Sequence, residues 1–156
     1  MEGEQCCKLF DPAPWDGKFW TWDEKRFIRD RVRTFLYMPL NFGKVMRNLD
    51  TVMTKAEASS PEGMSLSDSV SKWRTDLMVS VNKEVPGAEN LTLSGIFFSK
   101  VYEGPFKDAG KWMNDFSAFV QAEGMAPEKF YSWYTTCPNC AKEHGSNHVV
   151  LFAKIG

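Results

Sequence analysis

The chain has 156 residues, a length that suits one domain with a core of its own and is short for two ordinary domains. Its 19 basic residues almost balance its 20 acidic ones, without a run of like charge, so it lacks the electrostatic footprint of a protein that binds nucleic acid or an anionic membrane. We therefore expect no nucleic-acid partner and no membrane partner.

The hydropathy of the chain and its first residues indicate the cellular compartment. No apolar stretch approaches the roughly 18 residues that a membrane span requires, and MEGEQCCKLFD lacks the basic and apolar regions of a signal peptide. We expect a cytoplasmic protein, whose four cysteines are reduced thiols, metal ligands or redox groups rather than a disulfide framework. Aromatic residues make up 14% of the chain, which indicates a need for flat apolar surface.

The first part of the chain, residues 1–24, is expected to be an irregular N-terminal arm. DPAPWDG places two prolines and a glycine in a short stretch, which breaks any regular pattern. Trp15 and Trp20 would hold this arm against the domain. The following stretch, DEKRFIRDRVRTFLYMP, fits both a helical spacing and the alternation of a strand.

Two amphipathic helices and several strands are predicted after this stretch. Apolar residues at helical spacing from Asn41 predict a helix that ends before SSPEG. Strands are predicted at WRTDLMVSV (73–81) and LTLSGIFFSKVY (91–102). A second helix follows GPF, with apolar residues at the same relative positions as the first helix: Trp112, Met113, Phe116, Phe119 and Val120.

The two helices indicate an internal duplication. GKVMRNLDTVM (43–53) and GKWMNDFSAFV (110–120) share Gly, Lys and Met at the same places and have apolar residues at every core position. Two amphipathic helices could agree this far by chance, but the order of the surrounding elements favours two halves that each run strand, helix, strand, strand. By analogy with the strand before the second helix, residues 31–38 are predicted to be a strand.

The second half of the chain resembles a known family. It runs strand, GPF, amphipathic helix, KFYSWYTTC strand, polar loop and VVLFAKI strand. This order resembles the GyrI-like small-molecule-binding domain, an SHS2-type duplicated βαββ module. Members often carry a Gly-Pro-aromatic step between the first strand and the helix, here Gly104, Pro105 and Phe106. The resemblance covers roughly residues 25–155 and contains no motif as specific as a catalytic signature.

The resemblance implies a fold of the α+β class. It implies one domain, residues 25–156, with an antiparallel sheet built from two pseudo-symmetric βαββ repeats at about 25–85 and 90–155. Two helices would cover one face, and a hydrophobic ligand cleft would occupy the other. Strand 91–102 has apolar residues on both faces, so its second face also needs cover, either from a ligand cleft or from the tryptophans of the arm.

The resemblance also implies a function. The family includes the effector domains of multidrug-responsive regulators, and stand-alone proteins of which some hydrolyse strained electrophilic drugs. No helix-turn-helix precedes the domain, so we expect a stand-alone protein that binds hydrophobic, often cationic aromatic small molecules. A hydrolase that uses the same cleft is the alternative. We expect no cofactor, and a monomer or a homodimer.

An acidic residue is the first candidate for the ligand site. Members typically place an acid on the last strand of a half, where it meets cationic drugs. In VVLFAKI the matching position is Val150, so the usual glutamate is missing there. In the first half Asp76 holds the pseudo-symmetric position, with Met78 following on the same face. Asp76 is either the pocket acid or the partner of Arg74 in an edge-strand ion pair.

The other candidate ligand-binding residues are aromatic or apolar: Tyr37, Trp73, Tyr102, Trp133, Val150 and Phe152. A hydrolase of the family type would need a carboxylate, with a tyrosine to help orient water. Asp76 or Glu103 could act with Tyr37 or Tyr102. The sequence carries no Ser-His-Asp signature, phosphate loop or HExxH motif, so no catalytic residue is assigned.

The stretch CPNCAKEHGSNH, residues 137–148, has cysteines spaced as in a zinc knuckle. A closed tetrahedral site needs four ligands, and the additional ones would come from Cys6, Cys7 or His144. A redox CxxC would lack the strand-to-helix context that lowers a thiol pKa. We predict a hairpin loop with reduced thiols and no metal, and zinc and redox chemistry stay as the alternatives.

Overall fold

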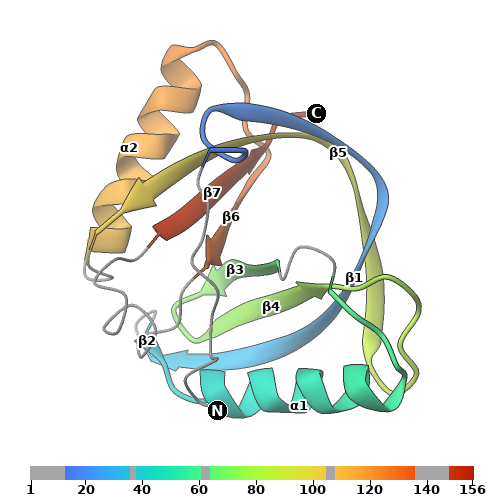
Figure 1. Ribbon diagram of the computed structural model, residues 1–156. Helices are drawn as coiled ribbons and strands as arrows, with labels where there is room; N and C mark the ends of the chain where they lie inside the picture. Colours follow the sequence, from blue (N-terminus) through green and yellow to red (C-terminus); the bar gives the residue numbers. More distant parts are fainter. Residues whose placement is uncertain (1–12, 36–37, 61–63, 105–107, 136–147) are drawn as a thin grey trace. The chain divides into compact units, whose positions relative to one another are not determined.

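The computed structural model describes residues 13–35, 38–60, 64–104, 108–135 and 148–156 (Figure 1). The chain forms two compact units. We call them the terminal unit, Met1–Thr21 with Gly95–Gly156, and the central unit, Trp22–Ser94. Two long strands, β1 (Lys18–Phe35) and β5 (Glu89–Glu103), belong to both units and pair with each other.

The central unit combines an antiparallel sheet with one helix. The strands follow the order β2 (Met38–Pro39), β1, β4 (Arg74–Ser80) and β3 (Ser65–Ser71). The helix α1 (Phe42–Lys55) runs alongside this sheet. Side chains of β4 alternate between its two faces, and Leu77 and Val79 point toward the helix.

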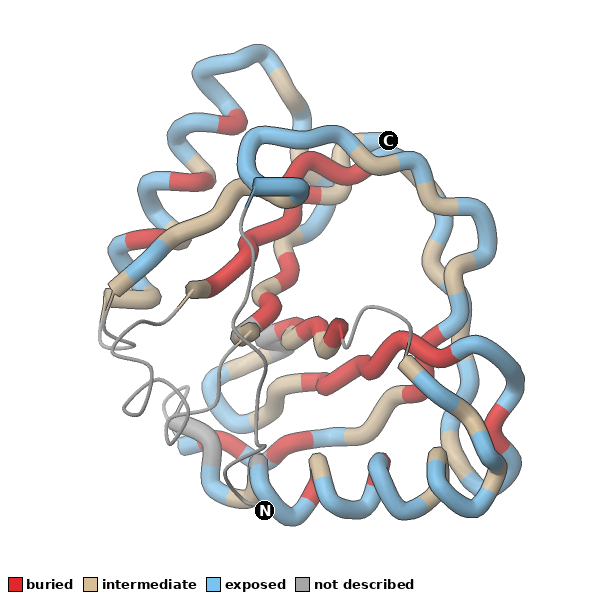
Figure 2. Tube along the Cα trace, in the orientation of Figure 1, coloured by how far each residue is buried: buried red, intermediate tan, exposed pale blue. Residues whose placement is uncertain are grey.

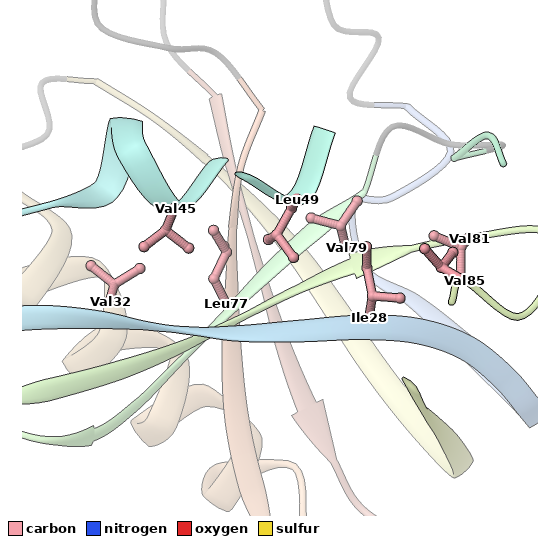
Figure 3. Packing of buried hydrophobic residues seen from close by; sticks show 8 residues of the cluster. All are labelled: Ile28, Val32, Val45, Leu49, Leu77, Val79, Val81 and Val85. Atoms are coloured by element: carbon pink, nitrogen blue, oxygen red, sulfur yellow. The ribbon is translucent and has the colours of Figure 1, made fainter. Parts of the chain in front are cut away.

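The core of the central unit lies between α1 and the sheet. Figure 3 shows Val45 and Leu49 of α1 pointing toward aliphatic side chains of β1 and β4. Each fully buried aliphatic side chain contributes about 1.5–3 kcal/mol relative to exposure, so the apolar stripe of α1 fixes which face of the sheet it covers. The remaining members of this core are Ile28, Val32, Leu77, Val79, Val81 and Val85.

The terminal unit repeats the pairing of a sheet with a helix. Its strands follow the order β6 (Lys129–Tyr134), β7 (His148–Lys154) and β5, and all the pairs are antiparallel. The helix α2 (Ala109–Ala122) packs on this sheet, and Figure 2 shows β7 buried along almost its whole length. The core of this unit consists of Phe98, Trp112, Phe116, Val120, Val149, Leu151 and Ala153.

The predicted fold class is wrong. From the sequence we expect one α+β, SHS2-type layer with both helices on one face of an antiparallel sheet and a cleft on the other. Strands dominate the described chain instead, and the two helices pack in separate hydrophobic cores, α1 in that of the central unit and α2 in that of the terminal unit. Strands as long as β1 and β5 twist and bend and do not stay in one flat layer.

Both long strands have unusual backbone near the boundary between the units. Glu24 of β1 has a φ of 51° and Gly95 of β5 a φ of 132°, so neither residue is in the extended conformation of a regular strand. The Glu24 amide donates to Ser94 Oγ at 2.8 Å beside this irregularity. A Cβ at Gly95 would lie 2.3 Å from the carbonyl oxygen of Gly156, so this position requires glycine for space as well as for conformation.

Individual elements agree better with the sequence than the fold class does. The two predicted helices and the strands at β4, β5, β6 and β7 are confirmed. The ambiguous stretch is a strand as far as Phe35, but β1 begins at Lys18, so the last residues of the expected arm are also strand. The strand β3 is not predicted from the sequence, because its residues SLSDSVS are mostly serine. Neither described helix is long and apolar enough to cross a membrane.

Candidate ligand-binding site

The acidic face is our name for the side of the central sheet that points away from α1, around Asp68 and Asp76. Asp76 on β4 lies directly opposite Asp68 on β3, and opposite Arg31 on β1. Both carboxylate residues are buried, with exposed fractions of 5% for Asp76 and 7% for Asp68. Two like charges opposite each other repel, and burial makes each charge costly without a partner.

Arg74 supplies a partner for Asp76. It lies two residues earlier on β4 and therefore on the same face. Its Nε donates to Asp76 Oδ1 at 3.0 Å, and its Nη2 donates to Asp76 Oδ2 at 3.3 Å. This two-pronged geometry is the strong form of an arginine–carboxylate contact. The ion pair is thus present, although β4 is an interior strand between β1 and β3, not an edge strand.

Apolar side chains flank the two acids on the same face. Met78 of β4 lies opposite Leu66 of β3, one position along the face from Asp76 and Asp68. Met78 and Leu66 are buried, and so is Phe27 of β1. The acidic face therefore places two carboxylates beside buried apolar side chains, which is the combination that a hydrophobic cation requires.

The aromatic face is our name for the side of the terminal sheet that points away from α2, together with Trp15 and Trp20. On this side Trp133 of β6 lies opposite Val150 of β7, and Phe152 of β7 lies opposite Ser99 of β5. The ring of Trp15 lies 4.7 Å from Trp20, 5.0 Å from Trp133 and 6.1 Å from Phe152, measured between ring centroids. These distances are typical of interacting aromatic rings.

Ser99 fastens the segment that carries Trp15 to β5. The side chain of Ser99 is fully buried, and its Oγ donates to the Trp15 carbonyl at 2.6 Å and accepts from Trp20 Nε1 at 2.8 Å. The Gly17 amide donates to the Ser99 carbonyl at 2.9 Å, and Asp16 Oδ1 accepts from the Val101 amide at 3.1 Å. The polar groups of Ser99 thus fix two tryptophans on an otherwise apolar surface.

The structure separates the predicted ligand-binding residues into several places. Trp133, Val150 and Phe152 share the aromatic face. Asp76 and Met78 share the acidic face. Tyr37 lies outside the described residues.

Two of the predicted residues lie on neither face. Tyr102 points to the α2 side of β5, where its ring stacks on Trp112 at 6.1 Å. Trp73 is 56% exposed beside Phe35, in the turn between β3 and β4.

Tyr102 is held in its protonated form. Burial, followed by the hydrogen bond that its hydroxyl donates to Asp115 at 2.6 Å, raises the pKa of Tyr102 far above its usual range. Such a hydroxyl is a poor base near neutral pH. Glu103, the other acid considered for water activation, is 61% exposed, and its Oε2 lies 3.7 Å from His148 Nε2.

The described residues contain no group of three or more His, Cys, Asp or Glu that could hold a metal ion. Both cysteines of the CPNC stretch, and also Cys6, Cys7 and His144, lie outside the described residues. His148 is described and begins β7. The absence of zinc from the CPNC stretch therefore stays a prediction.

Two residues of these faces, Asp68 and Ser99, are not predicted from the sequence. Asp68 lies in SLSDSVS, where alternation of Leu66 and Asp68 with serines was the available signal of a strand with one buried face. Ser99 interrupts the apolar run IFFSKV, and a single polar residue on a buried face indicates a specific hydrogen-bonding role.

Comparison with known proteins shows the family of this chain and solved structures with a similar fold. The chain belongs to the family described as "Bacterial hydrolase", whose model matches residues 1–155. No curated protein matches the sequence.

Solved structures with a similar fold include a hydrolase from Listeria innocua, with 12% identity, a TM-score of 0.62 and coverage of 90% of this chain and 92% of that one. The EcmrR C-terminal domain has 10% identity, a TM-score of 0.66 and coverage of 91% and 98%. SAV2435 bound to tetraphenylphosphonium has 8% identity, a TM-score of 0.54 and coverage of 90% and 94%. At these identities the likeness shows the fold alone.

Proposed function

We propose that this protein binds hydrophobic aromatic small molecules and prefers those that carry a positive charge. The observation that carries the proposal is the buried pair of Asp68 and Asp76 beside the apolar side chains of Met78 and Leu66. A flat cation gains charge pairing from the carboxylates and apolar contact from their neighbours. The similar fold of SAV2435, which is bound to the hydrophobic cation tetraphenylphosphonium, supports this proposal. The GyrI-like resemblance of the sequence agrees with it.

The preference for a cation is expected to be modest. Arg74 already neutralises part of the charge of Asp76 through two hydrogen bonds. A ligand cation therefore competes with an existing partner, and the charge contributes about 1–2 kcal/mol to binding.

The aromatic face is the second element of the proposal. Trp133, Val150 and Phe152 form an apolar layer that is buried in the structure, and Trp15 stands edge-on to Trp133 at an interplanar angle of 88°. Tryptophan rings provide large contact area at a small cost in conformational entropy. We assign stacking of aromatic ligands to the aromatic face of the terminal unit, and separately assign binding of cations to the acidic face of the central unit.

Fluorescence polarisation with a panel of flat dyes tests the proposal. Cationic dyes are expected to bind saturably with micromolar dissociation constants, as is typical of an apolar surface with few polar contacts. Trp133→Leu should weaken the whole panel several-fold, because stacking surface is lost whatever the charge of the dye. Phe119→Leu, a half-exposed aromatic position on α2, is the matched control and should change nothing. Absence of saturable binding across the panel would refute the proposal.

Hydrolysis of a bound electrophile is the second candidate function. The match of the whole chain to the bacterial hydrolase family favours it, as does the similarity to hydrolases from Listeria innocua. Asp68 and Asp76 could hold a water molecule between them, and one carboxylate could take its proton as the water attacks a strained ring. The ring bond to oxygen would break, and the released oxygen would take up that proton.

Rates with an aryl epoxide decide between binding and hydrolysis. An enzyme that uses the two acids should release diol with multiple turnovers, and Asp68→Asn and Asp76→Asn should each lower kcat by a factor of about 100 or more. A binding protein should leave the epoxide intact while still binding it. Product formation that both variants retain in full would contradict the assigned role of the acids.

A further inference from the structure

A pocket of about 410 Å³ lies in the central unit, and Arg74, the ion-pair partner of Asp76, is part of its lining. Its lining comes from the end of β1, from the first turns of α1 and from the turn between β3 and β4. It includes Trp73 and Arg74, and neither Asp68 nor Asp76 contributes to it.

The lining of this pocket is strongly basic. Four cationic residues, Arg31, Arg33, Lys44 and Arg74, line it against a single carboxylate, Asp30. Arg74 is already paired with Asp76. Within the part of the chain that the structure describes, the side chains of Arg31, Arg33 and Lys44 form no ion pair. The chain as a whole has a net charge of −1, so this concentration of positive charge is a local feature.

An exposed aromatic pair stands beside the basic lining. Trp73 and Phe35 are each 56% exposed, and their ring centroids are 5.7 Å apart. Thr34 fixes the wall that carries them, because its amide donates to the Trp73 carbonyl at 2.9 Å and its hydroxyl donates to the Lys72 carbonyl at 2.7 Å. Large aromatic side chains left in water next to a pocket are typical of ligand contacts.

We infer that this pocket binds a small aromatic anion: a flat ring that carries a carboxylate, sulfonate or phosphate group. The ring lies on Trp73, and the anionic group is attracted by Arg33 and Lys44. This ligand has the opposite charge to the one proposed for the acidic face, so the inference does not depend on the proposed function. It assigns the protein a second binding site with its own selectivity.

Three pyrene probes test the inference: 1-pyrenebutyrate, the neutral 1-pyrenebutanol and a pyrenebutyl trimethylammonium salt. Their rings are identical, so differences in dissociation constant report the charge. We expect the wild-type protein to bind the carboxylate more tightly than the alcohol, and to lose this advantage at high salt because the cations are partly exposed. Equal dissociation constants for the carboxylate and the alcohol would overturn the inference.

Variants locate the charge-dependent binding. R33Q/K44Q should weaken 1-pyrenebutyrate roughly threefold to tenfold while leaving 1-pyrenebutanol unchanged. D30N should have the opposite effect and tighten the carboxylate, because it removes a repelling charge while its amide oxygen can still accept from the Arg31 amide. The control K55Q/K83Q removes the same charge from exposed positions of the central unit that do not line the pocket.

Two results would contradict the assignment of this pocket. An equal loss of carboxylate affinity in K55Q/K83Q and R33Q/K44Q would show a general charge effect rather than a site. A D30N variant that binds the carboxylate no more tightly than wild type would place the anion elsewhere. Either result overturns the assignment, and melting curves of all variants establish that they are folded.

Discussion

Ser99 is the residue through which the aromatic face is most sharply tested. Its buried hydroxyl donates to the Trp15 carbonyl at 2.6 Å and accepts from the indole N–H of Trp20 at 2.8 Å. Ser99→Ala removes both hydrogen bonds and adds no bulk. A buried polar group that loses its partner costs about 1–3 kcal/mol, and Trp15 and Trp20 are only half-buried, so water compensates in part. We expect a loss of about 2 kcal/mol in the free energy of unfolding.

Chemical denaturation and thermal melting measure this loss. For a chain of this length, about 2 kcal/mol corresponds to a fall in Tm of roughly 4–8 °C. Acrylamide quenching of tryptophan fluorescence should also increase, because Trp15 and Trp20 lose their attachment to β5. Binding of aromatic dyes should weaken for the same reason.

Ser94→Ala is the matched control, since Ser94 is on the same strand. Its hydroxyl accepts a hydrogen bond from the Glu24 amide in an exposed setting, so its loss should cost less than about 1 kcal/mol. If Ser99→Ala were no more destabilising than Ser94→Ala and left tryptophan quenching unchanged, the role assigned to Ser99 would be refuted.

Three further predictions concern stability. Gly95→Ala should lower the free energy of unfolding, measured by denaturant titration, by about 1–3 kcal/mol, because Gly95 has a φ of 132° and the added Cβ meets the Gly156 carbonyl. The control Gly110→Ala in α2 should stabilise the protein by up to about 1 kcal/mol. Similar effects of the two substitutions would argue against the backbone described at Gly95. Tyr102→Phe should lower the free energy of unfolding at neutral pH. The difference from wild type should shrink as the pH rises above about 10, because the unfolded tyrosine then loses its proton while the folded one, with its raised pKa, keeps it, so the wild-type protein loses stability. A difference that does not change with pH would contradict this prediction. Replacing Cys137 and Cys140 with serine should change stability by no more than about 1 kcal/mol, and about one zinc per chain in elemental analysis would overturn that prediction.

The sequence is sufficient to locate most of the elements. The apolar stripes of α1 and α2 have a period close to 3.6 residues, and the runs at β5 and β7 are long and apolar, so these patterns have one dominant interpretation. The strand β3 lacks this signal, because only Leu66 of SLSDSVS carries a large apolar side chain known to be buried.

The arrangement of the elements is not determined by the same local patterns. A helix stripe shows that a face is buried, but not against which strands, and the two helices turn out to have separate cores. The bends at Glu24 and Gly95 have no signal in the apolar pattern, because a φ value depends on contacts such as the Glu24 amide to Ser94 Oγ.

The candidate site shows the same division between local and long-range information. Asp76 and Met78 share a face because they are two residues apart on one strand, which alternation predicts. The meeting of Asp76 with Asp68 depends on the register between β3 and β4, and the meeting of Trp15 with Trp133 joins residues that are far apart in the chain. Tyr102 lies on the other side of β5 because alternation places it with Phe98, which packs in the core with α2.

The central claim, that the protein binds hydrophobic aromatic molecules with a preference for cations, is tested most directly by calorimetric titration of an isosteric pair. An aryl trimethylammonium ion and its neutral tert-butyl analogue have nearly the same shape and differ in charge. We predict that the wild-type protein binds the cation more tightly and that Asp76→Asn weakens the cation by about 1–2 kcal/mol while leaving the neutral analogue nearly unchanged. Equal affinities of the wild-type protein for the two ligands, or equal losses in Asp76→Asn, would contradict the claim.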